Sequence, residues 1–392
     1  MQYRINPKNN DRLSALGFGC MRFSRKGGSI DYAKAEQELI HAIDGGINYL
    51  DTAYIYPGSE TFLGKFLSKG YREKIKLATK LPLMMIKKQQ DIEAKFSEQK
   101  SRLKTDRIDY FLMHMLTSMK QWERLKGLGI EDWIAEKKRL GEIVNIGFSY
   151  HGGTGEFKRI IDDYDWDFCY IQYNYMDERS QAGVEGLRYA AQKGIPVMIM
   201  EPLRGGTLAS KLPGEAVKRF EREQSEFTPA QWGLRWLFDQ PEPTVVLSGM
   251  NSTEMIDQNI SVADSSPVGC MDEAEHRLIN EVRDIIKSAM RISCTGCSYC
   301  MPCPQGVDIP VCFSSYNILH TEGWFKGMKT YFMCTSMRRD PSIASNCIGC
   351  GKCERHCPQG IQIREELKKV TKELETPVYK IAKGLSKRFV KF

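Results

Sequence analysis

The stretch YLDTAYIYPGSETFLG, residues 49–64, joins the end of an apolar segment to the start of an amphipathic one. The apolar segment covers residues 47–53 and has the length and composition of a buried strand. The amphipathic segment continues to about residue 70 with the spacing of a helix. A strand followed by a helix is the repeating unit of an α/β fold, and the same alternation recurs on both sides of this stretch.

Eight apolar segments of this kind lie in the first 250 residues, with helical patterns between and after them. Eight strand–helix units in about 250 residues predict a (β/α)8 barrel, or TIM barrel, whose strands are buried on both faces. A doubly wound sheet is the alternative, but no G-x-G-x-x-G follows the first strand. The predicted strands are residues 14–21, 47–53, 74–81, 108–115, 143–150, 167–175, 196–203 and 243–250. The predicted helices lie near 31–46, 60–70, 92–105, 130–141, 155–163, 184–194, 228–240, 252–262 and 271–290, and a hairpin in 2–16 would close the barrel's bottom.

Composition and charge exclude several classes of protein. Hydrophobic residues make up 42% and charged residues 27% of the 392 residues, which is ordinary for a globular protein with a sizeable core. The net charge of +7 is spread without a run of five or six basic residues, so nucleic acid is not an expected partner. No apolar run reaches about 18 residues and the first residues lack a signal-peptide pattern. We therefore expect a cytoplasmic protein without a transmembrane segment.

Polar residues follow three neighbouring strands of the predicted barrel. Asp51 ends the second strand and Tyr56 comes shortly after it. Lys80 and His114 end the third and fourth strands. Taken alone, Asp51 could be a strand cap and Tyr56 a loop aromatic. Lys80 could be a solvated charge, and His114 a core histidine. Because catalytic groups of such barrels lie at the carboxyl ends of the strands, the four together predict an active site.

These four residues, in the segments YLDTAYIYPGSETFLG, LATK and IDYFLMH, resemble the aldo-keto reductase family over residues 10–265. The resemblance implies that Tyr56 is the general acid, that Lys80 and Asp51 tune it, and that His114 orients a carbonyl. It also implies a nicotinamide cofactor and a small carbonyl-like substrate. An ammonium beside Tyr56 would lower the pKa of the phenol from its usual value of about 10. Tyr56 would then protonate the oxygen that becomes negative as hydride arrives.

The same resemblance assigns contacts to the nicotinamide dinucleotide. Ser149 in GFSYHG and Gln172 in YIQYN match residues that hold the nicotinamide. The segment VLSGMNSTEMIDQN, which contains Gly249 and Asn259, matches the segment that binds adenosine.

Several positions in these segments differ from the family pattern. Gly249 and Met255 stand where many members carry the Lys and Arg that bind the 2′-phosphate, so the cofactor is NADPH or NADH with weak discrimination expected. Tyr150 follows Ser149 in place of an Asn, and Met200 stands where many members stack a tyrosine on the nicotinamide ring.

The thirteen cysteines divide the chain near residue 290, because three lie before it and ten lie between 294 and 357. The motif CIGCGKCERHCP is the C-x2-C-x2-C-x3-C-P run of bacterial ferredoxins, and CTGCSYCMPCP is its partner with one residue fewer. Crossed ligation predicts two [4Fe–4S] clusters, one held by Cys294, Cys297, Cys300 and Cys357 and the other by Cys303, Cys347, Cys350 and Cys353.

Three alternatives stay open for the cysteines. Cys312 or Cys334 could replace Cys303, whose spacing is short, and tetrahedral zinc is the alternative metal. Cys20 and Cys169 lie in predicted strands and are expected to be core residues.

We expect an aldo-keto reductase-like barrel in residues 1–285, and a smaller α+β ferredoxin-type domain with a helical insertion (311–346) in residues 286–370. Residues 371–392 form a basic helix or tail. This combination predicts an oxidoreductase that reduces a carbonyl-like molecule while its clusters transfer electrons, with a ferredoxin or flavoprotein as redox partner.

Hydride chemistry and single-electron chemistry would need a flavin or a radical-tolerant substrate to couple them, and we find no flavin motif. The alternatives are an electron-transfer protein whose barrel is a docking module, and an active reductase whose clusters are structural.

Overall fold

The structure of the protein is a computed structural model. It describes all residues except 224–225, 295, 297–299, 337–339, 358–359 and 390–392. Contacts divide the chain into two compact units. The barrel unit comprises Met1–Ser210 and Glu226–Ile279, and the cysteine unit comprises Lys211–Ser225 and Asn280–Phe392. The contacts therefore assign 211–225 and 280–285 to the cysteine unit, whereas the expected barrel domain, residues 1–285, includes them.

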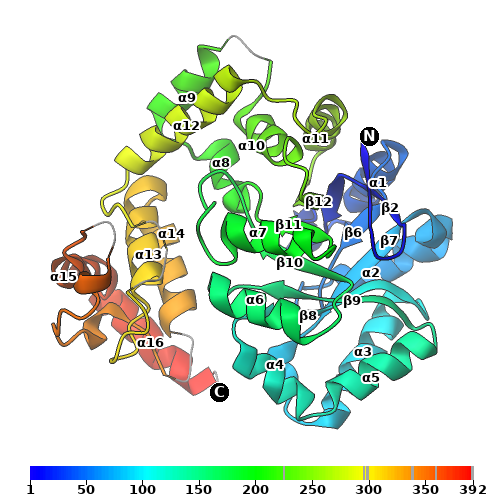
Figure 1. Cartoon of the computed structure of the whole chain (residues 1–392), viewed down its shortest axis with the longest axis horizontal. Coiled ribbons are helices and arrows are strands. Elements are labelled where there is room, and N and C mark those ends of the chain that lie inside the picture. Colours follow the sequence, from blue (N-terminus) through cyan, green and yellow to red (C-terminus); the bar gives the residue numbers. More distant parts are fainter. Residues whose placement is uncertain (224–225, 295, 297–299, 337–339, 358–359, 390–392) are drawn as a thin grey trace. The chain divides into compact units, whose positions relative to one another are not determined.

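The barrel unit contains eight parallel strands that close on themselves (Figure 1). Seven of the strands form within a predicted segment, and the strand that begins at Ile108 ends one residue beyond its segment, at Leu116. The pairing of the last strand with the first excludes the doubly wound sheet. The (β/α)8 barrel is confirmed. In chain order the barrel strands are β3 (Leu16–Gly19), β6 (Tyr49–Asp51), β7 (Lys76–Leu81), β8 (Ile108–Leu116), β9 (Ile143–Tyr150), β10 (Phe168–Gln172), β11 (Val197–Met200) and β12 (Pro243–Ser248).

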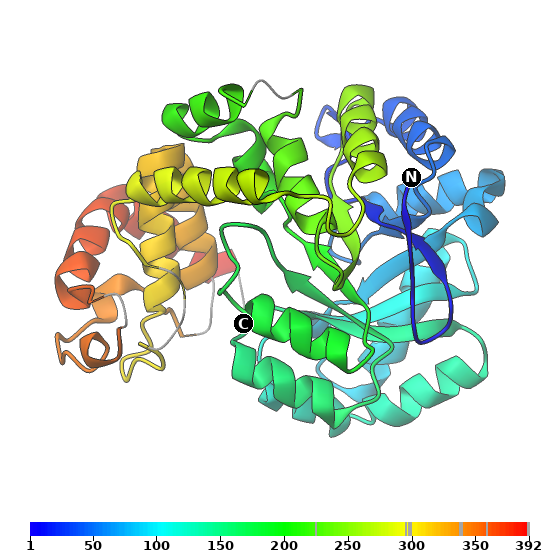
Figure 2. The same cartoon turned by 45° about the horizontal axis from the view of Figure 1, so that its top comes forward.

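Helices surround these strands in Figures 1 and 2. Local signals set several of their ends: Asp31 accepts a hydrogen bond from Lys34 N at the start of α1, and Thr228 and Gln231 form a capping box at the start of α10. The helices are α1 (Tyr32–Asp44), α2 (Ser59–Phe66), α3 (Gln89–Leu103), α4 (Met119–Lys126), α5 (Ile130–Arg139), α6 (Thr154–Asp163), α7 (Gly183–Gln192), α8 (Thr207–Ser210), α10 (Pro229–Phe238) and α11 (Thr253–Ser265). Of these, α4 and α8 were not predicted.

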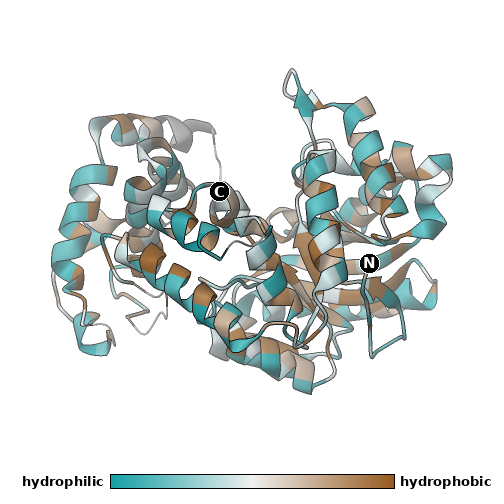
Figure 3. Ribbon diagram, turned by 90° about the horizontal axis from the view of Figure 1, so that it is seen from above, coloured by the Kyte–Doolittle hydropathy of each residue, from teal (hydrophilic) through white to brown (hydrophobic). Residues whose placement is uncertain are grey.

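The interior of the barrel is filled by a cluster of large side chains, among them Tyr49, Tyr110, Phe168 and Tyr170. The strands are correspondingly brown in Figure 3, which colours the chain by hydropathy. The hydroxyls of Tyr49 and Tyr170 lie 2.9 Å apart, so two buried phenols satisfy each other inside an apolar core. The polar groups of the candidate site therefore lie above a packed layer.

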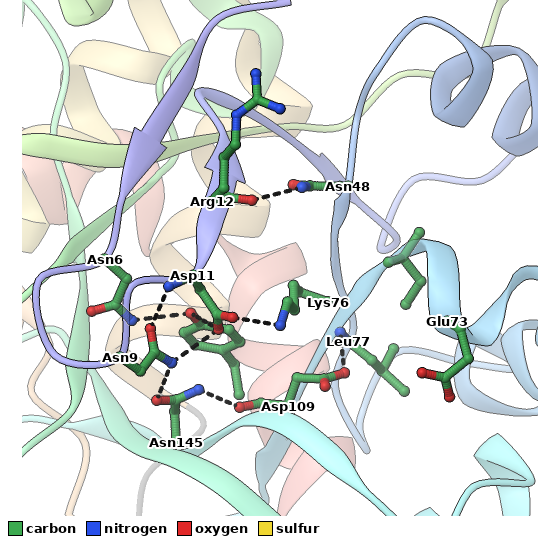
Figure 4. Close-up of polar contacts among 12 residues, drawn as sticks. Asn6, Asn9, Asp11, Arg12, Asn48, Glu73, Lys76, Leu77, Asp109 and Asn145 are labelled. Atoms are coloured by element: carbon green, nitrogen blue, oxygen red, sulfur yellow. Dashed lines mark hydrogen bonds and ion pairs between the residues drawn. The ribbon is translucent and has the colours of Figure 1, made fainter.

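A hairpin of β1 (Tyr3–Ile5) and β2 (Arg12–Ser14) precedes the barrel, as predicted. Its turn contacts the amino-terminal ends of the strands through polar groups (Figure 4). Asp11 accepts hydrogen bonds from Lys76 Nζ at 2.5 Å and from the Tyr110 hydroxyl at 2.8 Å. Asn9 Nδ2 lies 3.0 Å from Asn145 Oδ1. The hairpin thus closes the end of the barrel where the strands begin, opposite the carboxyl ends of the strands.

The cysteine unit has its own core, to which Phe313, Tyr331 and Leu367 contribute. The Tyr331 hydroxyl donates to Glu375 at 2.6 Å and accepts from the backbone N–H of Ala344 at 2.7 Å. We expected an α+β domain, but all regular elements in the described part of this unit are helical. They are α9 (Gly214–Glu221), the end of α12 (Glu273–Ser288), α13 (Ile309–Glu322), α14 (Trp324–Tyr331), α15 (Ile363–Leu374) and α16 (Pro377–Phe389), with short turns of helix over Phe332–Ser336, Ala344–Asn346 and Glu354–His356.

Two helices, α13 and α14, form the expected insertion between the cysteine motifs. Among the described residues, no helix combines the length and the apolar character that crossing a membrane requires.

Candidate functional site

A buried ion pair lies at the carboxyl ends of β6 and β7. Lys80 Nζ is 2.7 Å from both carboxylate oxygens of Asp51 and 2.7 Å from the carbonyl oxygen of Thr52. Only 3% of the Lys80 side chain and 6% of the Asp51 side chain are exposed. Burial alone would lower the pKa of Lys80, but Asp51 and Tyr56 outweigh it and raise the pKa above its ordinary value. Lys80 is therefore a fixed positive charge at neutral pH.

Tyr56 lies in the turn between β6 and α2, beside this charge. Its hydroxyl is 3.4 Å from Lys80 Nζ. Its backbone N–H donates to Ala53 O at 3.0 Å, which fixes the turn. Burial raises the pKa of Tyr56, and the lowering effect of Lys80 is smaller, so the net direction is upward. The expected lowering of this pKa is thus wrong, because the loss of hydration outweighs the neighbouring charge. Tyr56 keeps its proton and can donate it.

His114 lies near the end of β8, with its ring edge-to-face to Tyr56 at a centroid distance of 6.3 Å. Burial, with smaller effects from Lys80 and His151, lowers the pKa of His114 to about 3. The imidazole is therefore neutral and carries one N–H donor. Its Nδ1 atom is buried and has no hydrogen-bond partner among the described residues. The structure thus brings all four predicted catalytic residues to one end of the barrel.

The predicted nicotinamide contacts lie at the ends of later strands. The Ser149 hydroxyl at the end of β9 accepts a hydrogen bond from Met115 N at 2.8 Å. Gln172 ends β10, where its amide nitrogen donates to Asp177 at 3.1 Å and its oxygen accepts from Gln181 at 2.9 Å. Both side chains belong to the same end of the barrel as Tyr56, and neighbouring protein groups hold each of them in place.

The predicted adenosine-side residues lie next to β12. The side-chain nitrogen of Asn259 on α11 donates to the Ser248 hydroxyl at 3.1 Å, and both residues are buried. Gly249 follows Ser248 and lies directly beneath the side chain of Arg22.

Sequence reasoning missed four residues at this end of the barrel. Burial raises the pKa of Asp51, and Lys80 and the hydrogen bond from Tyr170 offset only part of this effect. The Tyr170 ring lies 5.7 Å from Lys80 Nζ. His151 directly follows β9, and Glu201 directly follows β11 with a left-handed φ of 55°. The strand-end rule would have found both His151 and Glu201. Arg22 lies in the loop after β3, and no local pattern marks it.

In the cysteine unit, five thiols line one cavity of about 200 Å³. They are Cys300, Cys303, Cys347, Cys350 and Cys353. Gly349 and Gly351 alternate with the last three and have left-handed φ angles of 73° and 72°, which only glycine adopts without strain. Gly349 N donates to Cys347 Sγ at 3.4 Å. The four predicted ligands of one cluster therefore surround a single cavity, together with Cys300, which was assigned to the other cluster.

Cys294 and Cys357 pack against the core of the cysteine unit, and Cys297 lies outside the described residues. Cys312 is fully buried, with its sulfur 3.8 Å from the carbonyl oxygen of Ser342, whereas Cys334 is exposed. Cys20 and Cys169 are buried in the barrel unit, as predicted.

The thiols surround the cavity instead of meeting at one point. No group of three or more His, Cys, Asp or Glu in the described part of the chain is placed to hold a single ion. Thiolates on several sides of a cavity are a donor set that fits a [4Fe–4S] cluster.

Comparison with known proteins matches both parts of the chain to families. Residues 15–281 match the aldo/keto reductase family, and residues 293–361 match a 4Fe-4S dicluster domain. An uncharacterised oxidoreductase of Bacillus subtilis is 24% identical over 72% of this chain and 96% of its own length. The protein tas of Escherichia coli is 25% identical over 66% of this chain and 92% of its own.

Solved structures agree with this assignment. An aldo-keto reductase from Bacillus halodurans in its holo form has a TM-score of 0.60 at 25% identity, covering 72% of this chain and 96% of its own. An aldo/keto reductase from Klebsiella pneumoniae in complex with NADP and acetate has a TM-score of 0.57 at 20% identity, with the same coverage, and shows the same fold.

Proposed function

We propose, since this chain belongs to the aldo/keto reductase family and carries a C-terminal 4Fe-4S domain, that it reduces the carbonyl group of a small molecule with NADPH or NADH. The observation that carries this proposal is the joint placement of Tyr56, Lys80, Asp51 and His114 at the carboxyl end of the barrel. The unpartnered Nδ1 of His114 fits a site that receives a polar ligand.

The nicotinamide, when bound, supplies a hydride to the carbonyl carbon. Tyr56 gives its hydroxyl proton to the carbonyl oxygen, which completes the two-electron reduction to an alcohol. The charge of Lys80 stabilises the tyrosinate that remains, and Asp51 holds Lys80 in place. His114, being neutral, donates a hydrogen bond to the same oxygen and orients it. Ser149 and Gln172 would hold the nicotinamide, and Gly249 and Asn259 would lie along the adenosine.

We further infer that the cysteine unit holds two [4Fe–4S] clusters with crossed ligation. The second set is the better supported, because Cys303, Cys347, Cys350 and Cys353 line one cavity. Cys350 is exposed, and Ile348, two residues earlier, is 66% exposed, so this cluster would lie near the surface of its unit. A cluster near the surface suits electron exchange with a ferredoxin or flavoprotein better than a purely structural role. A flavin or a radical-tolerant substrate would couple such single-electron steps to hydride transfer.

The first test is anaerobic turnover of a panel of aldehydes, ketones and quinones with NADH and NADPH. Oxidation of the nicotinamide in step with alcohol formation supports the reductase. If the barrel binds no nicotinamide and no carbonyl is reduced, while the clusters can still be reduced and reoxidised, the protein is an electron-transfer protein. Tyr150 and Met200, which differ from the family pattern around the nicotinamide, favour this second candidate.

The second test follows the absorbance of the reduced clusters on addition of a substrate. Bleaching or recovery that depends on substrate supports electron transfer through the clusters. Clusters that stay unchanged while carbonyl turnover continues would assign them a structural role.

A further inference from the structure

Arg22 lies across Gly249, the glycine of the segment expected to bind the adenosine. It belongs to the loop after β3, the first barrel strand, and its aliphatic stem covers Gly249, which follows the eighth strand, β12. A Cβ atom built on Gly249 would be 2.9 Å from Arg22 Cδ and 3.3 Å from its Cβ and Cγ. A side chain at 249 would therefore have to displace the stem of Arg22, which occupies the space that such a side chain would fill.

The guanidinium of Arg22 extends toward the loop after the seventh strand, β11. A Cβ atom built on Gly205 would be 3.1 Å from Arg22 Nη2, and Gly205 has a left-handed φ of 66°. A side chain at 205 would therefore both strain the backbone and displace the guanidinium. Arg22 thus bridges the loops that follow the seventh and eighth strands, a place where barrels of this type often bind phosphate.

Arg22 has no anionic partner in the described structure. It is exposed and forms no hydrogen bond or ion pair with a described residue, although the Glu201 carboxylate also lies near Gly205. Arg25, three residues later, differs because its guanidinium donates to Gly28 O at 2.8 Å and to Pro57 O at 3.1 Å. The charge of Arg22 is therefore available to a ligand, whereas that of Arg25 is already engaged.

We propose that Arg22 binds a phosphate group of the nicotinamide dinucleotide and supplies the positive charge that Gly249 and Met255 do not. The proposal rests on the proposed function. A planar guanidinium donates two parallel hydrogen bonds to phosphate oxygens, which suits both the diphosphate and a 2′-phosphate. The glycine at 249 then has a physical reason, because it leaves room for the stem of Arg22.

The experiment measures the Kd of NADH and NADPH by titration of the full chain, purified anaerobically, for the wild type, Arg22→Gln and Arg25→Gln. Removing a charged hydrogen-bonding partner should weaken binding about 10-fold or more in Arg22→Gln. Arg25→Gln should bind as the wild type does. If Arg22→Gln loses affinity for both cofactors, Arg22 binds the diphosphate. If it loses affinity for NADPH alone, Arg22 binds the 2′-phosphate.

Moving the positive charge from position 22 to position 249 provides a second test. The double variant Arg22→Ala with Gly249→Lys removes the stem and returns a cation to position 249, so it should recover at least part of the lost affinity. Equal Kd values for the wild type and Arg22→Gln, with both cofactors, would overturn the assignment of Arg22 and leave the reductase proposal standing. Failure of the wild type to bind either cofactor would overturn both.

Discussion

Tyr56 keeps its proton at neutral pH because the loss of hydration around its hydroxyl outweighs the charge of Lys80. We expect Tyr56→Phe to lower carbonyl turnover about 100-fold or more, since the ring's packing persists and only the proton donor is lost. Binding of the reduced nicotinamide should be unchanged. Because burial raises the pKa of Tyr56 above its ordinary value of about 10, loss of this proton should not lower the wild-type rate at any pH below that value. The measurement is steady-state kcat against pH.

Tyr54 provides the matched control for Tyr56. It lies two residues earlier in the same turn, but its hydroxyl donates to Glu98 at 2.8 Å and accepts from Lys95 at 2.7 Å, away from Lys80. Tyr54→Phe should keep near wild-type turnover. A Tyr56→Phe enzyme as fast as Tyr54→Phe would remove Tyr56 from the chemistry.

His114 should make stability depend on pH. Its folded pKa is about 3 and its ordinary value is about 6.5, so the unfolded chain binds the proton first as the pH falls. Stability is therefore fully present above about pH 6.5 and is lost as the pH falls toward 3, by about 2 kcal/mol between pH 7 and pH 5. His114→Gln should remove this loss of about 2 kcal/mol in the free energy of unfolding between pH 7 and pH 5. Denaturant unfolding between pH 5 and pH 7.5 measures it, and identical slopes would contradict the buried neutral imidazole.

At the scale of elements, the contact between α2 and α3 depends on Gly64. A Cβ atom at this position would meet the backbone carbonyl of Arg102 and would lie 2.9 Å from the carbonyl carbon of Leu103. Gly64→Ala should therefore cost about 1–3 kcal/mol, because one of the two helices must shift. The thermal midpoint of unfolding would fall by roughly 2–4 °C for each kcal/mol.

Gly155 on α6 is the control for this prediction, because a Cβ atom there would meet nothing within 4 Å. Gly155→Ala should be neutral or stabilise by up to about 1 kcal/mol, since alanine favours the helix. Equal midpoints for the two alanine variants would mean that α2 and α3 are not in close contact.

The elements show what the sequence could and could not predict. The eight barrel strands were predictable because strands buried on both faces are apolar along their whole length. The helix α4 was missed although Met119, Trp122 and Leu125 are buried at helical spacing, which is a signal that was present. The strands expected around the cysteines do not form in the described residues, because cysteine spacing constrains ligands and leaves the surrounding elements undetermined.

The candidate site also has features that the sequence predicts and features that it does not. Its four proposed catalytic residues follow from the rule that strand ends carry function. The contact between Arg22 and Gly249 does not, because it exists only once the pairing of β3 with β12 closes the barrel. The direction of the Tyr56 pKa also depends on burial, which the sequence does not give.

At the scale of the whole molecule, the cofactor content is the decisive quantity. Two complete ligand sets predict about eight iron and eight sulfide per chain in anaerobically purified protein. Cys350→Ser should lose about half of both, and the cysteine unit should become less stable, because metal binding and folding are coupled in small metal-held units. Chemical assay of iron and sulfide measures this, together with the absorbance of the clusters.

Cys270→Ser is the control, since Cys270 lies in the barrel unit and outside both motifs. It should retain the wild-type iron and sulfide. Zinc without sulfide in the wild type would contradict the iron–sulfur assignment, and four iron would mean that one ligand set does not assemble.

The path of the chain between its two units limits how they can be separated. The segment 211–225 leaves the barrel unit before its last two helices, and its helix α9 joins the cysteine unit, where Arg219 Nε lies 2.5 Å from Glu281. The chain thus crosses from one unit to the other three times. A gene cut at a single point cannot yield either unit intact, and a chain ended at residue 279 would separate Arg219 from Glu281. The two functions are therefore not interchangeable modules joined end to end, and an engineer who wishes to exchange one must excise two stretches of sequence together.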